Sequence, residues 1–596
     1  MDAVNALQQV LNVQQAIQVV AALALTAYLF PKQAVVFDNQ EFDFIVVGAG
    51  SAGTVVAYRL AECNFNVLLI EAGGDPTASS LMPALFPYLA HTAMDWNYTN
   101  VPVEGQFQCF RAQTVNLTIG HVLGGTSSIN YMFYVRGCPG DFSSWATAAN
   151  DSSWGYNGML PYFIKSERLE DREILSSSYR RYHGTNGFLG VTRDDDPKLR
   201  PYLESFEELG NAVLLDINAD RGLGYTRQMY TIAEGVRQST AYSILSQRKN
   251  ANLKVLRGTF VTRILFDETN NAIGVRAINE DNEEITLRAK HEVIVSAGTL
   301  NSPRLLMSSG IGPEEHLTSL NIPVRKNLPV GQNLQDHYPI IFSLKMEESN
   351  KPPPPTNPHK FPFPALTGYV ALNKSQKCPT YQAINMLIPA GSRSPMQLCV
   401  FNYGFQFDIC QKFYEGGKNR NTIFVFLALL HPKSRGRVLL RSSNPRDPPL
   451  VNDRYHENGE DLETLVDSVM DYMRVLNTSY FRSVNSEMVD LKLQMCQGLE
   501  KFTREWWRCY VRCMVFTFYH YTGTCALGSV VDNKLRVFGV GRLRVMDASV
   551  MPRIVGANTN AATIAIGEKG AETIIREYSC RDQSLFNILH QKFNLW

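Results

Sequence analysis

Short apolar runs and longer amphipathic segments alternate near the beginning of the chain. Residues 42–47 form an apolar, β-branched run that is typical of a buried parallel strand. A glycine-rich turn follows at residues 48–53, and residues 54–63 place apolar side chains at a helical spacing. A second apolar run at Val67–Ile70 ends in Glu71. This order predicts a strand, a glycine turn, a helix and a second strand in one unit.

The rest of the chain carries sparser patterns, which predict further strands and a second unit. Apolar runs predict a pair of strands within residues 252–266 and another strand at 292–298. A Pro-rich loop at 351–358 precedes a long apolar strand at 422–430 and an amphipathic helix at 461–475. We therefore expect a second sheet that carries helices. The sequence shows no internal repeat.

Composition narrows the class of protein. The chain has 596 residues, of which 45% are hydrophobic and 19% charged, so it can bury a large core and form more than one structural unit. Lys and Arg total 57 against 56 for Asp and Glu, a formal charge of +1. This balance argues against a nucleic-acid partner, and the even spread of apolar residues argues against extensive disorder. A large enzyme is expected.

The N-terminal segment bears on localisation. Residues 17–30 are uncharged and mostly apolar, but the run is shorter than the roughly 20 residues that span a bilayer. Its length suits a signal-peptide core, although no Lys or Arg precedes it. An amphipathic helix docked on the protein is the alternative. We expect residues 1–30 to be a signal peptide and the protein to be secreted, otherwise cytoplasmic, with no membrane partner.

The cysteines give a weaker signal. The 11 cysteines are scattered, which does not suggest a disulfide scaffold, and one or two bridges are expected if the chain is secreted. Cys509 and Cys513 lie one helical turn apart, but a fourth ligand at regular spacing is missing. No metal site is expected.

The glycines at residues 48–53 have the G-x-G-x-x-G spacing of a dinucleotide site. Gly48 permits a tight turn, Gly50 lets the backbone approach a pyrophosphate, and Gly53 lets the helix pack on the strand. The helix N-terminus then faces the phosphates, and Glu71 can accept hydrogen bonds from a ribose diol. NAD and FAD both fit at this point, and the N-terminal placement favours FAD.

Six further segments follow in a fixed order. Together with the glycine turn they resemble the glucose–methanol–choline (GMC) family of FAD-dependent alcohol oxidoreductases, over about residues 41–580. In the sequence of these segments the chain most resembles the insect members, which include ecdysone oxidases and glucose dehydrogenases and oxidases. The segments are residues 121–137 (HVLGGTSSINYMFYVRG), 295–312 (VSAGTLNSPRLLMSSGIG), 330–337 (VGQNLQDH), 519–525 (YHYTGTC), 543–549 (LRVMDAS) and 552–568 (PRIVGANTNAATIAIGE).

The resemblance implies an α/β fold, α+β overall. A discontinuous, Rossmann-like FAD-binding domain would comprise residues 41–155, 230–336 and 515–580, and a substrate domain of a sheet plus helices would comprise 156–229 and 337–514. The cofactor-binding positions implied by the resemblance and by the glycine turn are Gly48, Gly50, Ser51, Ala52, Gly53, Glu71, Gly124, Gly125, Thr126, Asn130, Val261, Ala297, Gly298, Asp547, Ala548, Asn558 and Thr559.

Two positions depart from the family pattern. Members that attach FAD covalently through a histidine carry it where this chain has Ile129, so FAD is expected to bind non-covalently. The basic triplet that often precedes the LGG segment is Ile119-Gly120-His121 here, which puts one phosphate-side contact in doubt.

The chemistry implied is the oxidation of an alcohol to a carbonyl by hydride transfer to the flavin. The hydroxyl proton then needs a base, and a neutral imidazole with an ordinary pKa of about 6.5 suits this role. The resemblance places His520 at that position and Asn560 as a second donor that stabilises the alkoxide. His337 is expected to be structural, and the aromatic residues around His520 to form wall and core.

The substrate is less well defined by these motifs. An ecdysteroid hydroxyl is the preferred substrate, with oxygen as the preferred acceptor, because the surroundings of His520 are aromatic and nearly uncharged. Glucose or an aromatic alcohol is the alternative within the family, and another acceptor can replace oxygen. An NAD-linked dehydrogenase and a catalytically inactive flavin-binding protein are the alternatives outside this activity. The motifs do not determine an oligomeric state.

Overall fold

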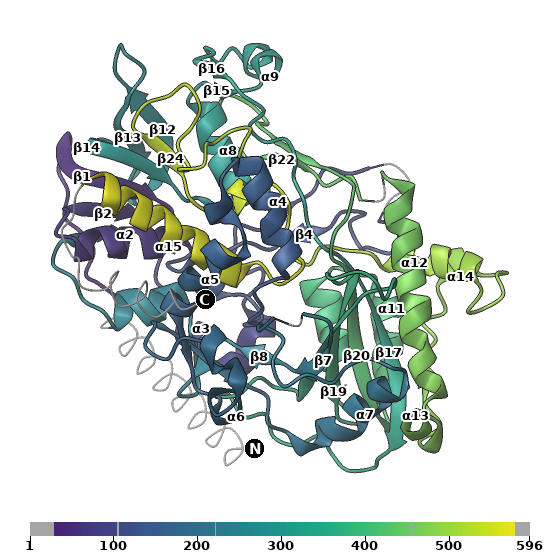
Figure 1. Ribbon diagram of the computed structural model, residues 1–596. Helices are drawn as coiled ribbons and strands as arrows, with labels where there is room; N and C mark the ends of the chain where they lie inside the picture. Colours follow the sequence, from purple (N-terminus) through teal and green to yellow (C-terminus); the bar gives the residue numbers. More distant parts are fainter. Residues whose placement is uncertain (1–28, 104–106, 221, 456, 579–596) are drawn as a thin grey trace, which may run out of the picture.

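The computed structural model describes residues 29–103, 107–220, 222–455 and 457–578. Within them, two large β-sheets lie side by side, each with its own buried hydrophobic cluster (Figure 1). The mixed α/β class expected from the sequence is confirmed. The predicted signal peptide lies almost entirely outside the described residues.

The first sheet is built around the predicted N-terminal unit. Strand β1 (Gln40–Val47) pairs in parallel with β2 (Val67–Ile70), and helix α2 (Gly53–Glu62) connects them. The remaining strands are β11 (Leu253–Leu256), β12 (Phe260–Phe266), β13 (Ala272–Ile278), β14 (Glu284–Val295) and β24 (Leu543–Val545), in the order β11-β2-β1-β14-β13-β12 with β24 paired to β14. The strands expected within residues 252–266 thus lie at opposite ends of this sheet.

The two ends of the described chain meet on this sheet. Helix α15 (Asn560–Glu577) packs against α2, and the two appear as neighbouring yellow and purple helices in Figure 1. Glu568 of α15 accepts a charge-assisted hydrogen bond from Arg59 of α2 at 2.7 Å, and its side chain is fully buried. The C-terminal segment therefore completes the unit that the first strands begin.

The second sheet is antiparallel and forms a separate layer. Its strands are β7 (Gly224–Arg227), β17 (Tyr338–Glu348), β18 (Ala365–Val370), β19 (Tyr381–Ile388), β20 (Arg420–Leu429) and β23 (Glu487–Met488), in the order β23-β17-β20-β19-β18-β7. Helix α12 (Gly459–Met473) packs on β20, and it corresponds to the amphipathic helix predicted from the sequence. These strands are largely buried because helices pack on them.

Shorter elements connect the two sheets. Two of them, α4 and α5, pack against each other, and α5 also packs against α15 of the first unit. The longer connecting elements are α4 (Pro139–Ala149), α5 (Tyr156–Ser166), β6 (Leu189–Arg193), α7 (Arg200–Glu208), α8 (Gly298–Ser308), α9 (Glu314–Ser319), α11 (Phe407–Gly417) and α14 (Arg504–Met514).

Four disulfides join pairs of described cysteines, so the expectation of one or two bridges is wrong. Two of them link segments that are 404 and 240 residues apart in sequence, and spacing along the chain does not reveal such pairs. Cys509 and Cys513, considered above as metal ligands, each form a disulfide instead. The bridges are Cys109–Cys513, Cys138–Cys378, Cys399–Cys410 and Cys496–Cys509.

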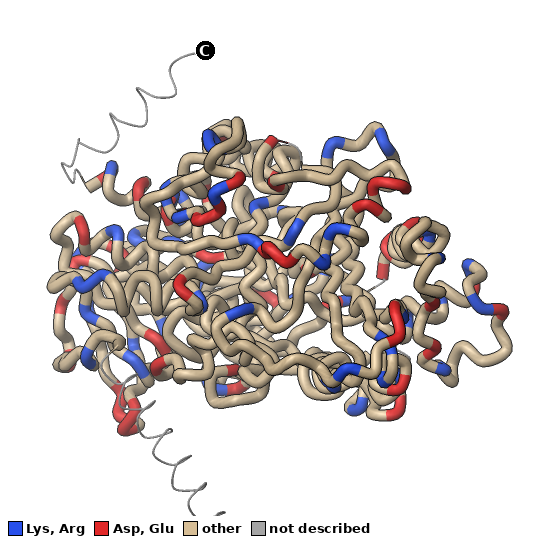
Figure 2. Tube along the Cα trace, turned by 90° about the horizontal axis from the view of Figure 1, so that it is seen from below, with Lys and Arg blue, Asp and Glu red and all other residues tan. Residues whose placement is uncertain are grey.

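The surface charge agrees with the composition. In the view of Figure 2, Lys and Arg alternate with Asp and Glu along the trace without a stripe of one sign. In the described part of the chain, no helix combines the length and the apolar character needed to cross a bilayer.

Candidate functional site

The turn after β1 requires glycine for two different steric reasons. Gly48 has a φ of +100°, and a Cβ there would lie 2.4 Å from the carbonyl oxygen of Ser296. A Cβ at Gly53 would lie 2.0 Å from the carbonyl oxygen of Gly48. The turn therefore packs against both the start of α2 and the end of β14, leaving its outer side for a ligand.

Two helices begin at the wall of one cavity. Neither α2 nor α15 has a side-chain cap at its first turn, and Ala52, Thr559 and Asn560 line the cavity. Unpaired N–H groups and the positive end of the helix dipole favour an anion at such positions. A dinucleotide with a pyrophosphate fits this arrangement.

Glu71 is held at the end of β2 beside the turn. Its Oε2 accepts a hydrogen bond from the Ala49 amide and its Oε1 one from the Gly73 amide, both at 2.9 Å. Burial raises the pKa of Glu71 to about 7, although the backbone donors act in the opposite direction. Each carboxylate oxygen keeps a second lone pair, and Glu71 lines the cavity where a ribose diol would be bound.

The LGG segment closes over the glycine turn from the other side. The Gly124 amide donates to the Ala49 carbonyl at 2.7 Å, and the Thr126 hydroxyl accepts from the Gly120 amide at 3.1 Å. Asn130 is oriented by the buried Arg237, which donates to its side-chain oxygen at 2.8 Å. The two segments thus contact each other directly, and residues of both line the same cavity.

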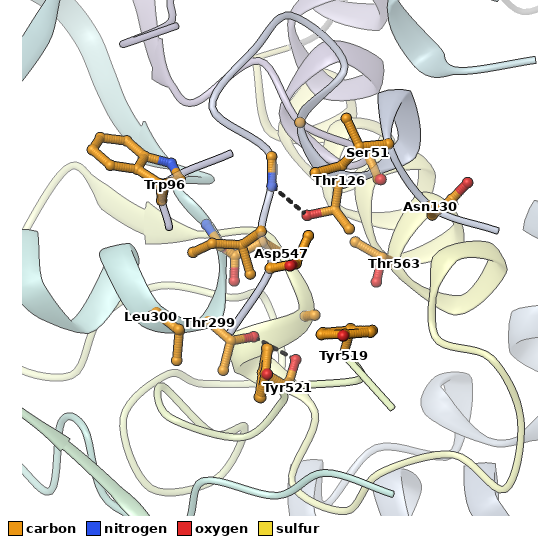
Figure 3. Close-up of a pocket in the computed structure, with 18 of the residues that line it drawn as sticks. Ser51, Trp96, Thr126, Asn130, Thr299, Leu300, Tyr519, Tyr521, Asp547 and Thr563 are labelled. Carbon is orange, nitrogen blue, oxygen red and sulfur yellow. Dashed lines mark hydrogen bonds between the residues drawn. The ribbon is translucent and has the colours of Figure 1, made fainter. Parts of the chain in front are cut away.

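The structure brings the candidate residues of the sequence together. Two of them, Gly53 and Gly124, lie behind the wall. The others line a single cavity, part of which is shown in Figure 3: Gly48, Gly50, Ser51, Ala52, Glu71, Gly125, Thr126, Asn130, Val261, Ala297, Gly298, His520, Asp547, Ala548, Asn558, Thr559 and Asn560.

The sequence offered no signal for a cationic and aromatic group in the same wall. The Arg304 guanidinium lies 5.4 Å from the ring centre of Trp96 and 4.8 Å from that of Phe260. It donates to the Tyr98 hydroxyl at 2.8 Å and forms no ion pair within the described residues. Burial lowers the pKa of Arg304. A buried cation without a carboxylate partner fits an anionic ligand such as the phosphates of FAD.

His520 sits at the other part of the cavity in a buried histidine pair. Its Nδ1 lies 2.8 Å from Nδ1 of His337. His337, expected from the sequence to be structural, is thus in direct contact with the predicted base. The Asp336 carboxylate accepts the backbone amides of both histidines, at 2.9 Å for His520 and 2.8 Å for His337. Burial lowers the pKa of His520 to about 3, so its imidazole is neutral at physiological pH.

The two asparagines of the N-T-N segment have different partners. The Asn558 Nδ2 lies 3.2 Å from Nε2 of His520, whereas the Asn560 Oδ1 accepts a hydrogen bond from the Ser51 hydroxyl at 2.7 Å. Asn558, predicted as a cofactor residue, is therefore the asparagine beside the histidine. Asn560 joins the start of α15 to the glycine turn.

Beyond His520 the wall is aromatic and uncharged. Phe518 packs on His520 with ring centres 4.8 Å apart, and the Tyr131 and Tyr403 hydroxyls lie 3.1 Å from each other. The charged lining residues Glu71, Arg304 and Asp547 all belong to the predicted cofactor part. Figure 3 shows Tyr519 and Tyr521 in this region, and the other aromatic lining residues here are Phe86, Tyr131, Phe133, Tyr403, Phe426, Phe516 and Phe518.

The glycine turn, the two helix N-termini and the buried imidazole of His520 together define a flavin-dependent oxidoreductase that acts on alcohols. Family models described as GMC oxidoreductase match residues 42–339 and 432–567, and the chain belongs to this family. Membership of this family identifies FAD as the cofactor, in agreement with the features of the cavity described above. It also identifies the protein as an enzyme rather than a binding module.

Curated relatives align with nearly the whole chain. An ecdysone oxidase of Spodoptera littoralis is 36% identical over 94% of this chain and 95% of its own length. A glucose dehydrogenase [FAD, quinone] of Drosophila melanogaster is 32% identical over 91% of this chain and 88% of its own. Pyridoxine 4-oxidase from Mesorbium loti has a TM-score of 0.74 at 26% identity, covering 90% of this chain and 99% of that one.

Denaturing the holoenzyme is expected to release free FAD. Ile129 occupies the position at which some members carry an attaching histidine, and its side chain cannot form such a bond. After acid precipitation, the flavin absorbance should be found in the supernatant. Flavin that stays with the washed precipitate would contradict non-covalent binding.

Proposed function

We propose that the enzyme oxidises a hydroxyl of an ecdysteroid-like alcohol, which is bulky, uncharged and largely apolar, with oxygen as electron acceptor. The observation that supports this is the wall beyond His520, where Phe86, Tyr131, Tyr403, Phe426 and Phe518 line the cavity without a charged side chain. Such a surface favours rings and fused hydrocarbon, and its tyrosine hydroxyls can bind further hydroxyls of the substrate.

His520 and Asn558 would carry the proton chemistry. A neutral His520 accepts the hydroxyl proton as the carbonyl forms, and Asn558 donates a hydrogen bond to the oxygen as negative charge develops on it. Bound FAD supplies the acceptor for the hydride that leaves the carbinol carbon. Asp336 holds the histidine pair through the two backbone amides.

Relatives support the ecdysteroid assignment over a sugar. The ecdysone oxidases of Spodoptera littoralis and Bombyx mori are 36% and 35% identical to the chain, and the insect glucose dehydrogenases 32–33%. Glucose remains the second candidate because sugars also stack on aromatic rings and use tyrosine hydroxyls.

A substrate panel tests the proposal directly. The holoenzyme is mixed anaerobically with ecdysone, glucose or an aromatic alcohol, and flavin absorbance is followed, after which air is admitted. We expect ecdysone to bleach the flavin fastest and air to restore its colour within the turnover time. Bleaching by glucose alone would overturn the substrate, and slow recolouring would overturn oxygen as acceptor.

Secretion is proposed on separate grounds. Four disulfides between described cysteines are typical of proteins that fold in an oxidising compartment. Expression of the full chain in cultured animal cells should place the flavoprotein in the medium, whereas retention in the cytosol contradicts the assignment.

A further inference from the structure

A buried chain of side-chain amides reaches from the second sheet to the base. Gln382 of β19 has a fully buried side chain, and its Nε2 lies 3.3 Å from Asn558 Oδ1 and 3.4 Å from the Thr367 hydroxyl oxygen. Asn558 in turn directs its Nδ2 at His520 Nε2, 3.2 Å away. Three successive contacts thus connect the core of the sheet to the imidazole.

Along this row of side-chain amides, the donor and acceptor role of each group follows from that of its neighbour. Gln382 Nε2 is a donor, so Asn558 Oδ1 is the acceptor and the remaining Asn558 group, Nδ2, is a donor. A donor facing His520 Nε2 requires a lone pair on that nitrogen. The proton of the neutral imidazole then resides on Nδ1, where it is donated to His337 Nδ1 at 2.8 Å.

From this arrangement we propose that Gln382 is a positioning residue that sets the tautomer of His520 by orienting the Asn558 amide. It keeps Nε2 of the base unprotonated on the side of the cavity. If the Asn558 amide turned over, its Oδ1 would face Nε2, and His520 would have to carry its proton there. The unprotonated nitrogen would then be Nδ1, which faces His337 and not the cavity, so the base could not take the hydroxyl proton.

The proposal rests on the proposed function only in taking His520 as the base, and it is independent of which alcohol is the substrate. It goes beyond that function because Gln382 does not itself line the cavity and has no contact with His520. Its influence is transmitted through Asn558, and nothing about the sequence around Gln382 singles it out.

Replacing Gln382 with glutamate separates this role from a purely structural one. Gln382→Glu has nearly the same shape, but a carboxylate can only accept, so Asn558 must turn its Nδ2 towards residue 382. When the buried carboxyl is protonated, it can donate to Asn558 Oδ1 and restore the original orientation. The rate of flavin reduction in this variant should therefore fall as the pH rises.

The surrounding groups leave this titration identifiable. Gln382 is paired with Tyr369 on β18 and with Ala428 on β20, and its side chain contacts Thr367 and Asn558. Asn558 connects it to the histidine pair, His520 and His337. His431, which hydrogen-bonds to Asp141, acts on His337 from further away. Burial raises the pKa of Tyr369 and lowers those of both histidines of the pair, so these groups hold their charge states near neutrality.

The experiment measures anaerobic flavin reduction by stopped flow between about pH 6 and pH 9, with whichever alcohol bleaches the holoenzyme. For Gln382→Glu, the ratio of the rate at high pH to that at low pH should drop at least about tenfold below the wild-type ratio. Gln382→Leu should be about tenfold slower at every pH, with the wild-type shape of profile.

A matched control is available on the same strand. Asn385 is also fully buried, and its side chain contacts the Tyr472 hydroxyl rather than Asn558. Asn385→Asp therefore introduces a buried carboxyl without touching the amide chain, and its pH profile should keep the wild-type shape. Flavin content and melting temperature are recorded for each variant.

The outcomes discriminate. A Gln382→Glu profile parallel to that of wild type, or a Gln382→Leu rate equal to it, overturns the role of Gln382 while leaving His520 as base. A His520→Ala variant that reduces flavin as fast as wild type overturns both. If Gln382→Glu does not fold, the rate of Gln382→Leu decides.

Discussion

Replacing His520 with alanine is expected to slow flavin reduction by the substrate at least about a hundredfold, which is the usual loss when a general base is removed. The imidazole is buried and neutral, with Nε2 on the side of Asn558 and Nδ1 bound to His337. Water cannot readily replace it, because the surrounding wall is aromatic. The measurement is single-turnover flavin bleaching under anaerobic conditions.

The control is a histidine outside the cavity. His359 is exposed and its Nδ1 contacts the Gly235 carbonyl, so His359→Ala should reduce flavin at the wild-type rate. FAD should remain bound in both variants. Wild-type bleaching in His520→Ala would falsify the assignment of the base.

The second large effect is expected at Asn558 rather than Asn560. Removing a single donor to a developing oxyanion costs roughly 10²–10³ in rate, so Asn558→Ala should lower flavin reduction by about a hundredfold or more. Asn560 forms no hydrogen bond with His520 in the structure, and its Oδ1 accepts a hydrogen bond from the Ser51 hydroxyl. Asn560→Ala should therefore change the rate by less than about fivefold and act mainly on FAD affinity.

Both variants should be compared for flavin content and for the rate of the loaded fraction. The reverse ranking, with Asn560→Ala the slower enzyme, would restore Asn560 to the role expected from the sequence. Equal effects would mean that the start of α15 acts as one unit and that neither asparagine can be assigned alone.

The dinucleotide unit could be predicted because its causes are local. The apolar runs and the helical spacing reflect burial within each element, and β1, α2 and β2 lie where these patterns indicate. Gly48 and Gly53 are required because a side chain there would collide with neighbouring backbone. Motif order then gave the family and its cofactor.

The finer geometry of the site depends on contacts between distant segments. His337 and His520 are 183 residues apart and meet because the start of β17 adjoins the segment after α14. Asn558 and Asn560 are separated by one residue, and their distinct partners follow from how the turn before α15 enters the fold. Neither periodicity nor motif spacing contains this information, and the same holds for the four disulfides.

The disulfide between Cys138 and Cys378 limits how the enzyme can admit its substrate. It crosslinks the residue before α4 to the β18–β19 loop, with Cα atoms 5.7 Å apart, and so ties the cofactor side to the second sheet. A hinge rotation of one layer against the other would stretch this bond. The crosslink therefore favours local movements over a hinge, and at the aromatic end two short segments, Pro83–Tyr88 and Leu398–Asn402, are joined by the hydrogen bond from Asn402 Nδ2 to the Pro87 carbonyl at 3.1 Å.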